Sequence, residues 1–322
     1  MSDSAQPFDP LAQLLKAAGD DLRLSILQAL ARDSYGVLEL AQVFEIGQSG
    51  MSHHLKVLAN AGLVTTRREG NSIFYRRANY APEDPFAGLK RELFRQIDAA
   101  PPAPPLVHLD RVWRDRSEAS RRFFLENANK FREQQDLIAG FEVYGHQVAE
   151  LLALSPQRAC ERALEVGPGA GEFLPVLSAR FARVLALDNS PEMLAQARQL
   201  AEQAVLGNIE FIEGDTGYLR QQPAAFDCAV ANMVLHHTPS PASLLADIGF
   251  SLKPGGVLLL TELCRHDQSW TRDACGDLWL GFDPEDLQNW AETAGLQEGQ
   301  SVYFALRNGF QIQVRQFIKP PL

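Results

Sequence analysis

The segment with the clearest chemical character is residues 163–172, with the sequence ALEVGPGAGE. Its apolar start, which includes Glu165, predicts a buried strand, and a glycine turn follows at Gly167, Gly169 and Gly171. Glycine is needed where a chain turns sharply while its backbone lies against a ligand. The spacing departs from the nicotinamide pattern G-x-G-x-x-G, because residues 173–174 are Phe-Leu where the last spaced glycine would fall. The loop therefore indicates a ligand, but not a nicotinamide dinucleotide.

Polar side chains end each of the next three predicted strands, 184–187, 209–213 and 226–231. The residues at these ends are Asp188, Asn189, Gly214, Asp215 and Asn232. A carboxylate after the second strand of such a sheet can accept both hydrogen bonds of a ribose diol. An acid after the third strand, at the same edge, can meet an adenine amino group. The pattern therefore indicates a ligand that contains adenosine.

Two histidines, His236 and His237, follow the strand 226–231 at the same predicted edge. If a substrate bound there must lose a proton, either imidazole is a candidate catalytic base. A positioning or packing role is the competing interpretation, and we favour it for both residues.

The cysteines show no pattern of a metal centre or a disulfide framework. Cys160, Cys228, Cys264 and Cys275 form no Cys-x-x-Cys pair, and no histidines cluster at zinc-site spacing. We expect neither a structural disulfide nor a metal site.

A second chemically distinctive stretch is residues 48–58, QSGMSHHLKVL. At helical spacing Met51, Leu55 and Leu58 share one face, which predicts a helix packed on that face. The opposite face then presents groups able to reach base edges in a DNA major groove, namely Gln48, Ser49, Ser52, His53 and Lys56. With the preceding helix and a turn at 45–47, the pattern predicts a helix-turn-helix.

A basic β-hairpin is predicted directly after this helix, with strands 63–68 and 72–76 around a turn at 69–71. It contains the arginines Arg67, Arg68, Arg76 and Arg77. Such a wing grips phosphate or the minor groove beside the recognition helix. The competing interpretation is an ordinary helical core with solvated arginines.

The whole chain has the length and composition of a two-domain protein. Its 322 residues are about twice the usual ~100–200 of one domain, and 46% hydrophobic residues exclude wholesale disorder. Short helices fill the first hundred residues, and a Pro-rich stretch at 99–105 predicts a semi-rigid linker. Strands at 163–166, 184–187, 209–213, 226–231 and 256–263 alternate with helices, and a hairpin at 301–318 turns on Asn308-Gly309.

We therefore expect an α/β protein with an N-terminal winged helix-turn-helix of α+β type and a C-terminal Rossmann-like sheet carrying an antiparallel edge hairpin. The expected borders are 1–98 for the first domain, 99–144 for the linker and connecting helices, and 145–322 for the second domain.

Charge is distributed unevenly between these regions. The formal net charge of -10 divides into 0 for residues 1–80, +1 for 81–133 and -11 for 134–322. The first region is thus the one compatible with nucleic acid. No apolar run approaches the ~18–20 residues that span a bilayer, and the start lacks a secretory signal, so we expect a cytoplasmic protein without a membrane partner.

Residues 10–97 resemble the ArsR/SmtB family of winged-helix repressors. The resemblance rests on GDDLRLSIL at 19–27, QSGMSHHLKVL at 48–58 and AGLV at 61–64. It implies a homodimer joined by its first and last helices, near 11–17 and 89–97, on a palindromic double-stranded DNA operator. Metal-sensing members carry a cysteine pair before the recognition helix, whereas this chain has no cysteine before Cys160.

Residues 145–318 resemble the class I S-adenosylmethionine-dependent methyltransferases, most closely the ubiquinone/menaquinone biosynthesis type. The resemblance implies S-adenosylmethionine or S-adenosylhomocysteine as the bound cofactor or effector. The glycine loop with Glu165 would then hold the amino acid part, Asp188 the ribose and Asp215 the adenine. Asn232 would line the methionine end.

Two functions follow from this combination. In the first, the methyltransferase-like domain is a sensor whose ligand modulates operator binding, as in the ArsR-type regulators that respond to S-adenosylhomocysteine. In the second, the chain is an active methyltransferase of a small molecule that also regulates its own operon. Identical anchors serve a cofactor and an effector, so the sequence leaves both open, and we favour the sensor.

Overall fold

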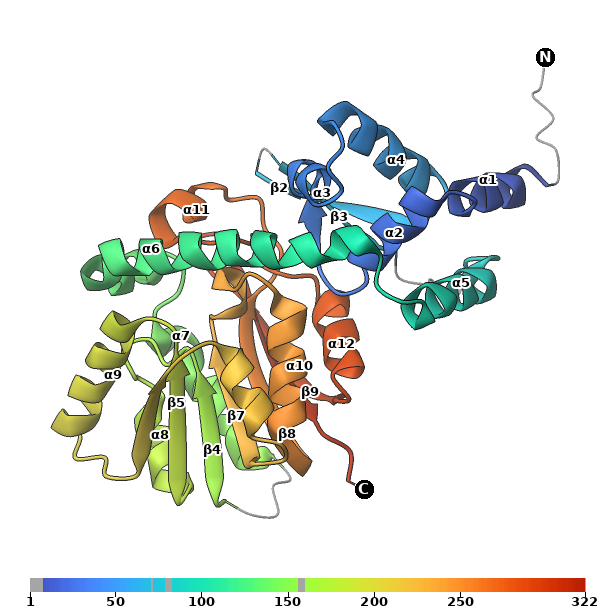
Figure 1. The fold of residues 1–322 in the computed structure, drawn as a ribbon. Coiled ribbons are helices and arrows are strands. Elements are labelled where there is room, and N and C mark those ends of the chain that lie inside the picture. Colours follow the sequence, from blue (N-terminus) through green and yellow to red (C-terminus); the bar gives the residue numbers. More distant parts are fainter. Residues whose placement is uncertain (1–7, 71, 79–82, 156–159, 322) are drawn as a thin grey trace. The chain divides into compact units, whose positions relative to one another are not determined.

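The computed structural model describes residues 8–70, 72–78, 83–155 and 160–321 (Figure 1). The chain separates into two compact units, Met1–Arg114 and Asp115–Leu322, and each is described by itself. In the described part, no helix combines the length and the apolar character that crossing a membrane requires.

The first unit contains five α-helices and a small sheet within its described residues. The helices are α1 (Asp9–Ala18), α2 (Asp21–Ala29), α3 (Val37–Val43), α4 (Gln48–Asn60) and α5 (Ala87–Ala99). Asp20 caps α2 by accepting a hydrogen bond from the Arg23 amide at 3.0 Å. The predicted helices are therefore all present, with ends that differ by a few residues.

The sheet of the first unit has the strand order β1-β3-β2, all antiparallel. β2 (Val64–Glu69) and β3 (Ser72–Arg77) form the expected hairpin. β1 (Tyr35–Gly36) is a two-residue strand that sequence reasoning missed, and it pairs with Phe74 and Tyr75 of β3. Its shortness leaves no alternating pattern to detect.

The Pro-rich segment after α5 belongs to the first unit. The Gln28 side chain of α2 donates to the carbonyls of Ile97, Ala100 and Pro101 and accepts from the Ala103 amide at 2.8 Å. The segment then forms the 3-10 helix η1 (Pro104–His108) and enters α6 (Leu109–Asp136). Because Leu109 and Val112 lie in the first unit's core, the division falls inside α6, whereas we expected the first border at residue 98.

The second unit is built on a seven-stranded sheet with the order β6-β5-β4-β7-β8-β10-β9. Its parallel strands are β4 (Arg162–Val166), β5 (Arg183–Asp188), β6 (Ile209–Glu213), β7 (Phe226–Asn232) and β8 (Leu252–Leu263). β10 (Gln311–Ile318) and β9 (Gln297–Ala305) add an antiparallel pair at one edge. This is the doubly wound arrangement with an edge hairpin that the sequence predicts.

Helices cover the sheet of the second unit, as Figure 1 shows for this part of the chain. They are α7 (Phe141–Leu154), α8 (Leu174–Arg180), α9 (Pro191–Gln203), α10 (Pro241–Ser251), α11 (Trp270–Cys275) and α12 (Pro284–Thr293), with the 3-10 helices η2 (Thr216–Gln221) and η3 (Leu235–His237). Val148 and Leu177 pack with Ala163 and Val230 in one buried cluster. The alternate strand residue Leu164 is also buried, as expected for strands covered on both faces.

The turn of the edge hairpin differs from the two-residue turn that Asn308-Gly309 predicts. β9 ends at Ala305 and β10 begins at Gln311, so the loop is longer. Gly309 has φ +90° within this loop, while the Asn308 amide donates to the carbonyls of Leu137 and Ile138 at 3.0 and 2.8 Å. Asn308 therefore lies within the turn, where the Gly309 amide donates to the Leu306 carbonyl at 3.2 Å, and its side chain also ties the hairpin to the segment before α7.

All four cysteines lie in the second unit as free thiols. Cys228 and Cys275 are buried, Cys264 is partly exposed and Cys160 is exposed.

Candidate functional site

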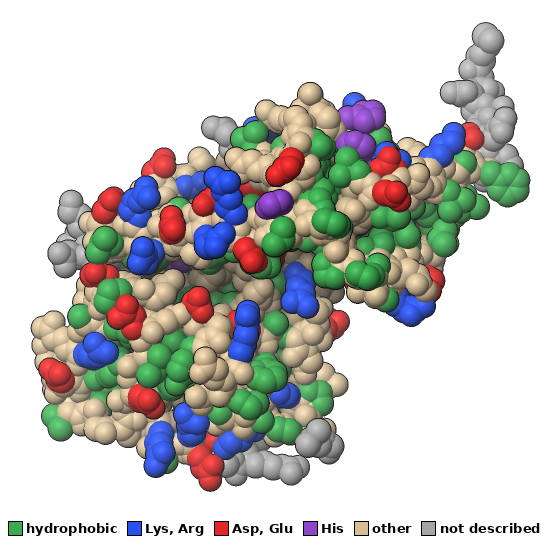
Figure 2. All heavy atoms as spheres, viewed as in Figure 1, with side chains coloured by type: hydrophobic (Ala, Val, Ile, Leu, Met, Phe, Trp, Pro, Cys, Tyr) green, Lys and Arg blue, Asp and Glu red, His purple; other side chains and the backbone are tan. Residues whose placement is uncertain are grey.

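The candidate DNA-reading face of the first unit is the outer side of α4. Met51, Leu55 and Leu58 are fully buried, which fixes the orientation of the helix on the core. The five predicted reading residues are then left on the other side: Gln48, Ser49, His53 and Lys56 are exposed and Ser52 is half-buried. In Figure 2, histidine side chains (purple) lie at the surface over α4.

The wing retains two of the predicted phosphate-binding arginines at its surface. Arg68 is exposed near the tip and donates to the Gly70 carbonyl at 3.1 Å. Arg76 is half-buried and donates to the Thr65 hydroxyl at 3.2 Å. The Arg68 contact uses its Nε atom, and its terminal guanidinium N–H groups face solvent, where phosphate could meet them.

Two other arginines of the hairpin, which we expected to contact DNA, form ion pairs within the first unit. Arg67 is only 5% exposed and forms an ion pair with Glu69, which is 1% exposed. Alternation along β2 turns Arg67 and Glu69 inward and Arg68 outward, so the basic run does not share one face. Arg77 forms a bidentate pair with Asp98 at 2.7 and 2.9 Å and joins the hairpin to α5.

In the second unit, strand register brings the predicted ligand residues to one edge of the sheet. Val166 of β4 is paired with Leu187 of β5 and Ala231 of β7, and Asp188 is paired with Glu213 of β6. The loop amides continue this order, because Gly167 donates to the Leu187 carbonyl and Gly214 to the Asp188 carbonyl, each at 2.8 Å. Carboxyl edges of parallel strands are where ligands bind in such sheets.

The three glycines of the loop have positive φ values of +63° (Gly167), +57° (Gly169) and +85° (Gly171). A side chain on Gly167 would meet Val234 at 2.6 Å, and one on Gly171 would meet the backbone of Ala197 at 3.0 Å. A Cβ on Gly169 would meet nothing within 4 Å. The first and third glycines are thus required by packing, and the middle one faces open space beside the strand ends.

Two acids of this edge, the buried Glu165 and the half-buried Asp188, have raised pKa values. Burial raises the pKa of Glu165 to about 8, and its Oε2 atom has no hydrogen-bond partner within the described residues. Burial also raises the pKa of Asp188 to about 6, although it accepts hydrogen bonds from the backbone amides of Ser190 and Asn189, which lower the pKa. Within the described residues, neither carboxyl group has a cationic or hydroxyl partner, and a ligand could supply one.

Asn232 and Asp215 complete the row of predicted anchors. The Asn232 side-chain oxygen accepts from the Thr261 hydroxyl at 2.8 Å, while its Nδ2 atom is buried with no acceptor among the described residues. Met233 follows with φ +56°, a strained turn of the kind found beside functional sites. Asp215 and Asn189 are exposed, and Asp215 caps η2 by accepting from the Gly217 amide at 2.8 Å.

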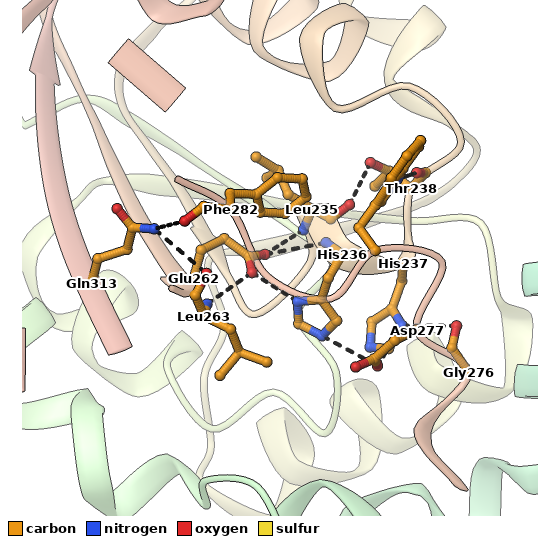
Figure 3. Close-up of polar contacts among 11 residues, drawn as sticks. Leu235, His236, His237, Thr238, Glu262, Leu263, Gly276, Asp277, Phe282 and Gln313 are labelled. Carbon is orange, nitrogen blue, oxygen red and sulfur yellow. Dashed lines mark hydrogen bonds and ion pairs between the residues drawn. The ribbon is translucent and has the colours of Figure 1, made fainter. Parts of the chain in front are cut away.

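His236 and His237 lie at the same edge, but both side chains are buried (Figure 3). Glu262 of β8 accepts from His236 Nδ1 at 2.8 Å and also from the backbone amides of Leu235 and Leu263. Asp277, in the loop after α11, lies 3.9 Å from His236 Nε2 and 3.8 Å from His237 Nδ1. Sequence reasoning missed Glu262 and Asp277, because neither belongs to a recognisable local motif.

Aromatic residues of α6 lie over part of this edge. Phe124 contacts the His237 ring at a centroid distance of 5.0 Å, and Phe123 and Phe124 pack on Met193 in the first turn of α9. Phe123 also lies against Gly276, where any added Cβ would be 2.4 Å from its ring. Tyr144 of α7 is buried in the core of the second unit.

Comparison with known families gives a separate match for each unit. Residues 20–66 match the family described as bacterial regulatory protein, arsR family, and residues 164–260 match the family described as methyltransferase domain. The chain joins an ArsR-family helix-turn-helix segment to a class I methyltransferase domain.

Several curated relatives are methyltransferases by name. They include the trans-aconitate 2-methyltransferase of Deinococcus radiodurans, 37% identical over 122 residues, and that of Methylobacterium nodulans, 40% identical over 112 residues. These matches cover 37% and 34% of this chain and 45% and 41% of the relatives. The chain thus spans less than half the length of these two enzymes.

Among solved structures, the complex between the Haloferax volcanii Trm112 methyltransferase activator and a methyltransferase contains a chain with the same fold. The match has a TM-score of 0.50 and 18% identity, and it covers 61% of this chain and 97% of that chain. At this identity the likeness establishes the fold of the methyltransferase domain and nothing about its substrate.

Proposed function

We propose that this protein is a DNA-binding transcriptional regulator whose methyltransferase domain binds S-adenosylhomocysteine or S-adenosylmethionine and thereby modulates operator binding. The observation that carries the proposal is the presence, in one chain, of an exposed polar recognition helix and a strand edge with unsatisfied ligand anchors. A cytoplasmic location accompanies the proposal, because operator DNA is found there.

The anchors of the strand edge fit this ligand class. Buried polar atoms without partners are costly, so Glu165 Oε2 and Asn232 Nδ2 favour a ligand that supplies a donor and an acceptor. The ammonium and carboxylate of the ligand's amino acid part are such groups. Asp188 would accept from the ribose hydroxyls, with Asn189 beside it, and Gly214 and Asp215 would lie at the adenine.

The open space at Gly169 is the second support for the ligand. Gly169 has φ +57°, and a Cβ added to it would meet nothing within 4 Å. Packing against neighbouring residues therefore does not account for the glycine at this position between Gly167 and Gly171. A ligand lying against the backbone does account for it. Gly167, Gly169 and Gly171 would therefore cradle the amino acid part.

In the first unit, α4 would read bases in the major groove through Gln48, Ser49, Ser52, His53 and Lys56. Arg68 and Arg76 of the wing would hold phosphate. A homodimer on a palindrome fits the exposed apolar side chains of the outer helices. Leu15 of α1 is 55% exposed and Leu89 of α5 is 42% exposed, and Figure 2 shows hydrophobic side chains (green) gathered over these helices.

An active methyltransferase with an autoregulatory DNA-binding domain is the second candidate. The identities of 37–40% to curated methyltransferases favour it. S-adenosylmethionine would supply a methyl group for in-line displacement, and the chain would need to orient an acceptor and exclude water. Phe123 and Phe124 are placed to exclude water, whereas the deep burial of His236 and His237 does not favour either as an exposed base.

The decisive experiment is a titration of operator affinity with each ligand. The DNA is a fragment selected from random sequence by the purified protein, and fluorescence anisotropy is measured at fixed salt with saturating S-adenosylhomocysteine or S-adenosylmethionine. A sensor should show a several-fold larger change with one ligand, about 1 kcal/mol or more of coupling, and we expect S-adenosylhomocysteine to have the larger effect. Unchanged affinity with both ligands, together with methyl transfer to an acceptor in cell extract, would establish the enzyme instead.

A further inference from the structure

A compact group of metal-ligating side chains lies beside the predicted ligand edge. His236, His237 and Asp277 each offer one ligand atom, and these atoms lie within 4.8 Å of one another. Their side chains are 1%, 8% and 3% exposed respectively. Figure 3 shows the Asp277 carboxyl group beside both imidazole rings.

Glu262 fixes the orientation of the first histidine. Its carboxylate already accepts from the amides of Leu235 and Leu263, so it is acceptor-only and the proton of the 2.8 Å contact belongs to His236 Nδ1. The lone pair of a neutral His236 then lies on Nε2, on the side of Asp277. Metal-binding histidines are commonly oriented by such a carboxylate on the second ring nitrogen.

Asp277 lacks the partners that a buried carboxylate needs. Neither of its oxygens receives a hydrogen bond in the described structure: the Thr271 hydroxyl lies close enough to lower the Asp277 pKa, which burial raises, but donates to the Gln268 carbonyl. The contacts of 3.8 and 3.9 Å to the histidines are too long for hydrogen bonds. A cation held between these atoms would shorten the separations to about 3–3.5 Å, given ligand bonds of about 2.0–2.1 Å.

The charge of the group favours a divalent ion. Glu262 and Asp277 are both buried, and if both imidazoles are neutral, no other side chain of this four-residue group balances the two negative charges. An ion of charge +2 balances them. An imidazolium at His236 is the competing arrangement, but it balances only one of the two charges.

We propose that His236, His237 and Asp277 form a binding site for a first-row transition-metal ion such as Zn²⁺, with Glu262 as the residue that orients His236. Two imidazoles and one carboxylate suit zinc, iron or nickel better than magnesium or calcium, which prefer oxygen ligands. Three protein ligands leave a coordination position open, as in metal sites that bind a water or a substrate oxygen.

The loop after α11 is held where the site requires it. The amides of Leu278 and Trp279 donate to the His236 carbonyl at 2.8 and 3.2 Å, and the Gly276 carbonyl lies 3.3 Å from His237 Nδ1. Gly276 has φ +75° and is pressed against Phe123. Asp277 is therefore positioned by backbone contacts. His237 Nδ1 is the donor in its contact with the Gly276 carbonyl, so an ion bound at Nδ1 would displace that proton and its hydrogen bond.

The test measures metal binding by the full-length protein after removal of bound metal by a chelator. Zn²⁺ affinity is determined by competition with a chromophoric chelator, and Co²⁺ is added to a second sample to record its visible absorption. We expect one tight equivalent and Co²⁺ bands of a nitrogen- and oxygen-ligated ion. Asp277→Asn should weaken Zn²⁺ binding at least 100-fold, and Glu262→Gln should weaken it 10- to 100-fold.

Asp273→Asn is the matched control, because Asp273 is exposed on the neighbouring α11 and should leave Zn²⁺ affinity unchanged. Circular dichroism checks that each variant is folded. If Asp277→Asn does not fold, the Co²⁺ spectrum of the wild type shows whether nitrogen and oxygen ligands bind the ion. Absence of a tight Zn²⁺ equivalent in the wild type, or wild-type affinity in folded Asp277→Asn, would overturn the proposal. Calorimetry with S-adenosylhomocysteine on the metal-free protein tests the proposed function separately.

Discussion

Asp188, half-buried at the end of β5, has a pKa raised by desolvation, and we expect this to make ligand affinity depend on pH. Ribose hydroxyls donate to the ionised carboxylate, so the ligand binds better to the ionised form of Asp188. In the free protein this form becomes protonated as pH falls through about 6. We expect S-adenosylhomocysteine affinity, measured by calorimetry, to fall up to about tenfold from pH 7 to pH 5. Asp188→Ala should abolish binding, and an unchanged affinity in that variant would place the ligand elsewhere.

The same residue should show opposite effects on stability and on binding. A carboxyl group with a folded pKa above its ordinary value of 3.8 costs stability as it ionises, so its cost appears as pH rises from about 4 to above 6. We therefore expect Asp188→Asn to raise the thermal midpoint at pH 7 but not at pH 4, while it weakens ligand binding. Glu202→Gln, an exposed change on α9, is the control and should alter neither property.

Among single residues, sequence reasoning succeeded where a side chain follows a strand end and failed where a contact depends on distant segments. The register of β4, β5, β6 and β7 brings Asp188, Gly214 and Asn232 to one edge as expected. The partners of His236 could not be predicted, because Glu262 and Asp277 come from β8 and from the loop after α11. Only packing of the whole sheet brings these segments together.

At the scale of elements, α4 and the hairpin should respond to mutation in three distinct ways. Ser52→Ala or His53→Ala should weaken specific DNA binding by about 1–3 kcal/mol and relax base preference. Arg68→Ala should weaken binding to all sequences and lower the salt slope by about one. Anisotropy titrations on specific and random DNA distinguish these outcomes, and equal losses on both DNAs for Ser52→Ala would contradict the reading role of α4.

Arg67→Ala should instead destabilise the fold, because it leaves Glu69 buried without its ion-pair partner. Removing one member of a buried pair costs about 3–5 kcal/mol. Denaturant unfolding should detect this loss, and the salt slope of DNA binding by the folded fraction should stay at the wild-type value. A reduced slope would mean that Arg67 reaches phosphate after all.

The Pro-rich segment offers an independent test of element packing. Gln28→Ala removes the side chain that bonds Ile97, Ala100, Pro101 and Ala103. We expect a loss of about 1–3 kcal/mol in the free energy of unfolding and faster proteolysis within residues 99–104. Gln96→Ala, which removes an exposed contact to Glu92, should leave both measurements unchanged.

Most elements could be predicted from sequence, because their periodicity is strong. The parallel strands of the second unit begin and end within a few residues of their expected limits. The linker was harder, since proline content indicates stiffness but cannot show that Gln28 holds the segment against α2. The inward position of Arg67 was also missed, because a cluster of charges in the sequence conceals the alternation of a strand.

At the scale of the whole molecule, a sensor must obey thermodynamic reciprocity. If S-adenosylhomocysteine changes operator affinity by some factor, saturating operator DNA must change S-adenosylhomocysteine affinity by the same factor. Calorimetry with and without the selected DNA fragment measures this. Random DNA of equal length is the control, and an effect in one direction only would show that the two measurements do not report one coupled equilibrium.

The distribution of the cysteines also allows thiol labelling to follow the unfolding of the second unit alone. Residues 1–114 contain no cysteine, so a thiol reagent does not label the first unit. In the second unit Cys160 should label at once, whereas Cys228 and Cys275 are buried with raised pKa values and should label only when their surroundings open. The labelling rate of these two thiols in rising denaturant, compared with the loss of helical circular dichroism from the entire chain, would show whether the first unit unfolds separately from the second.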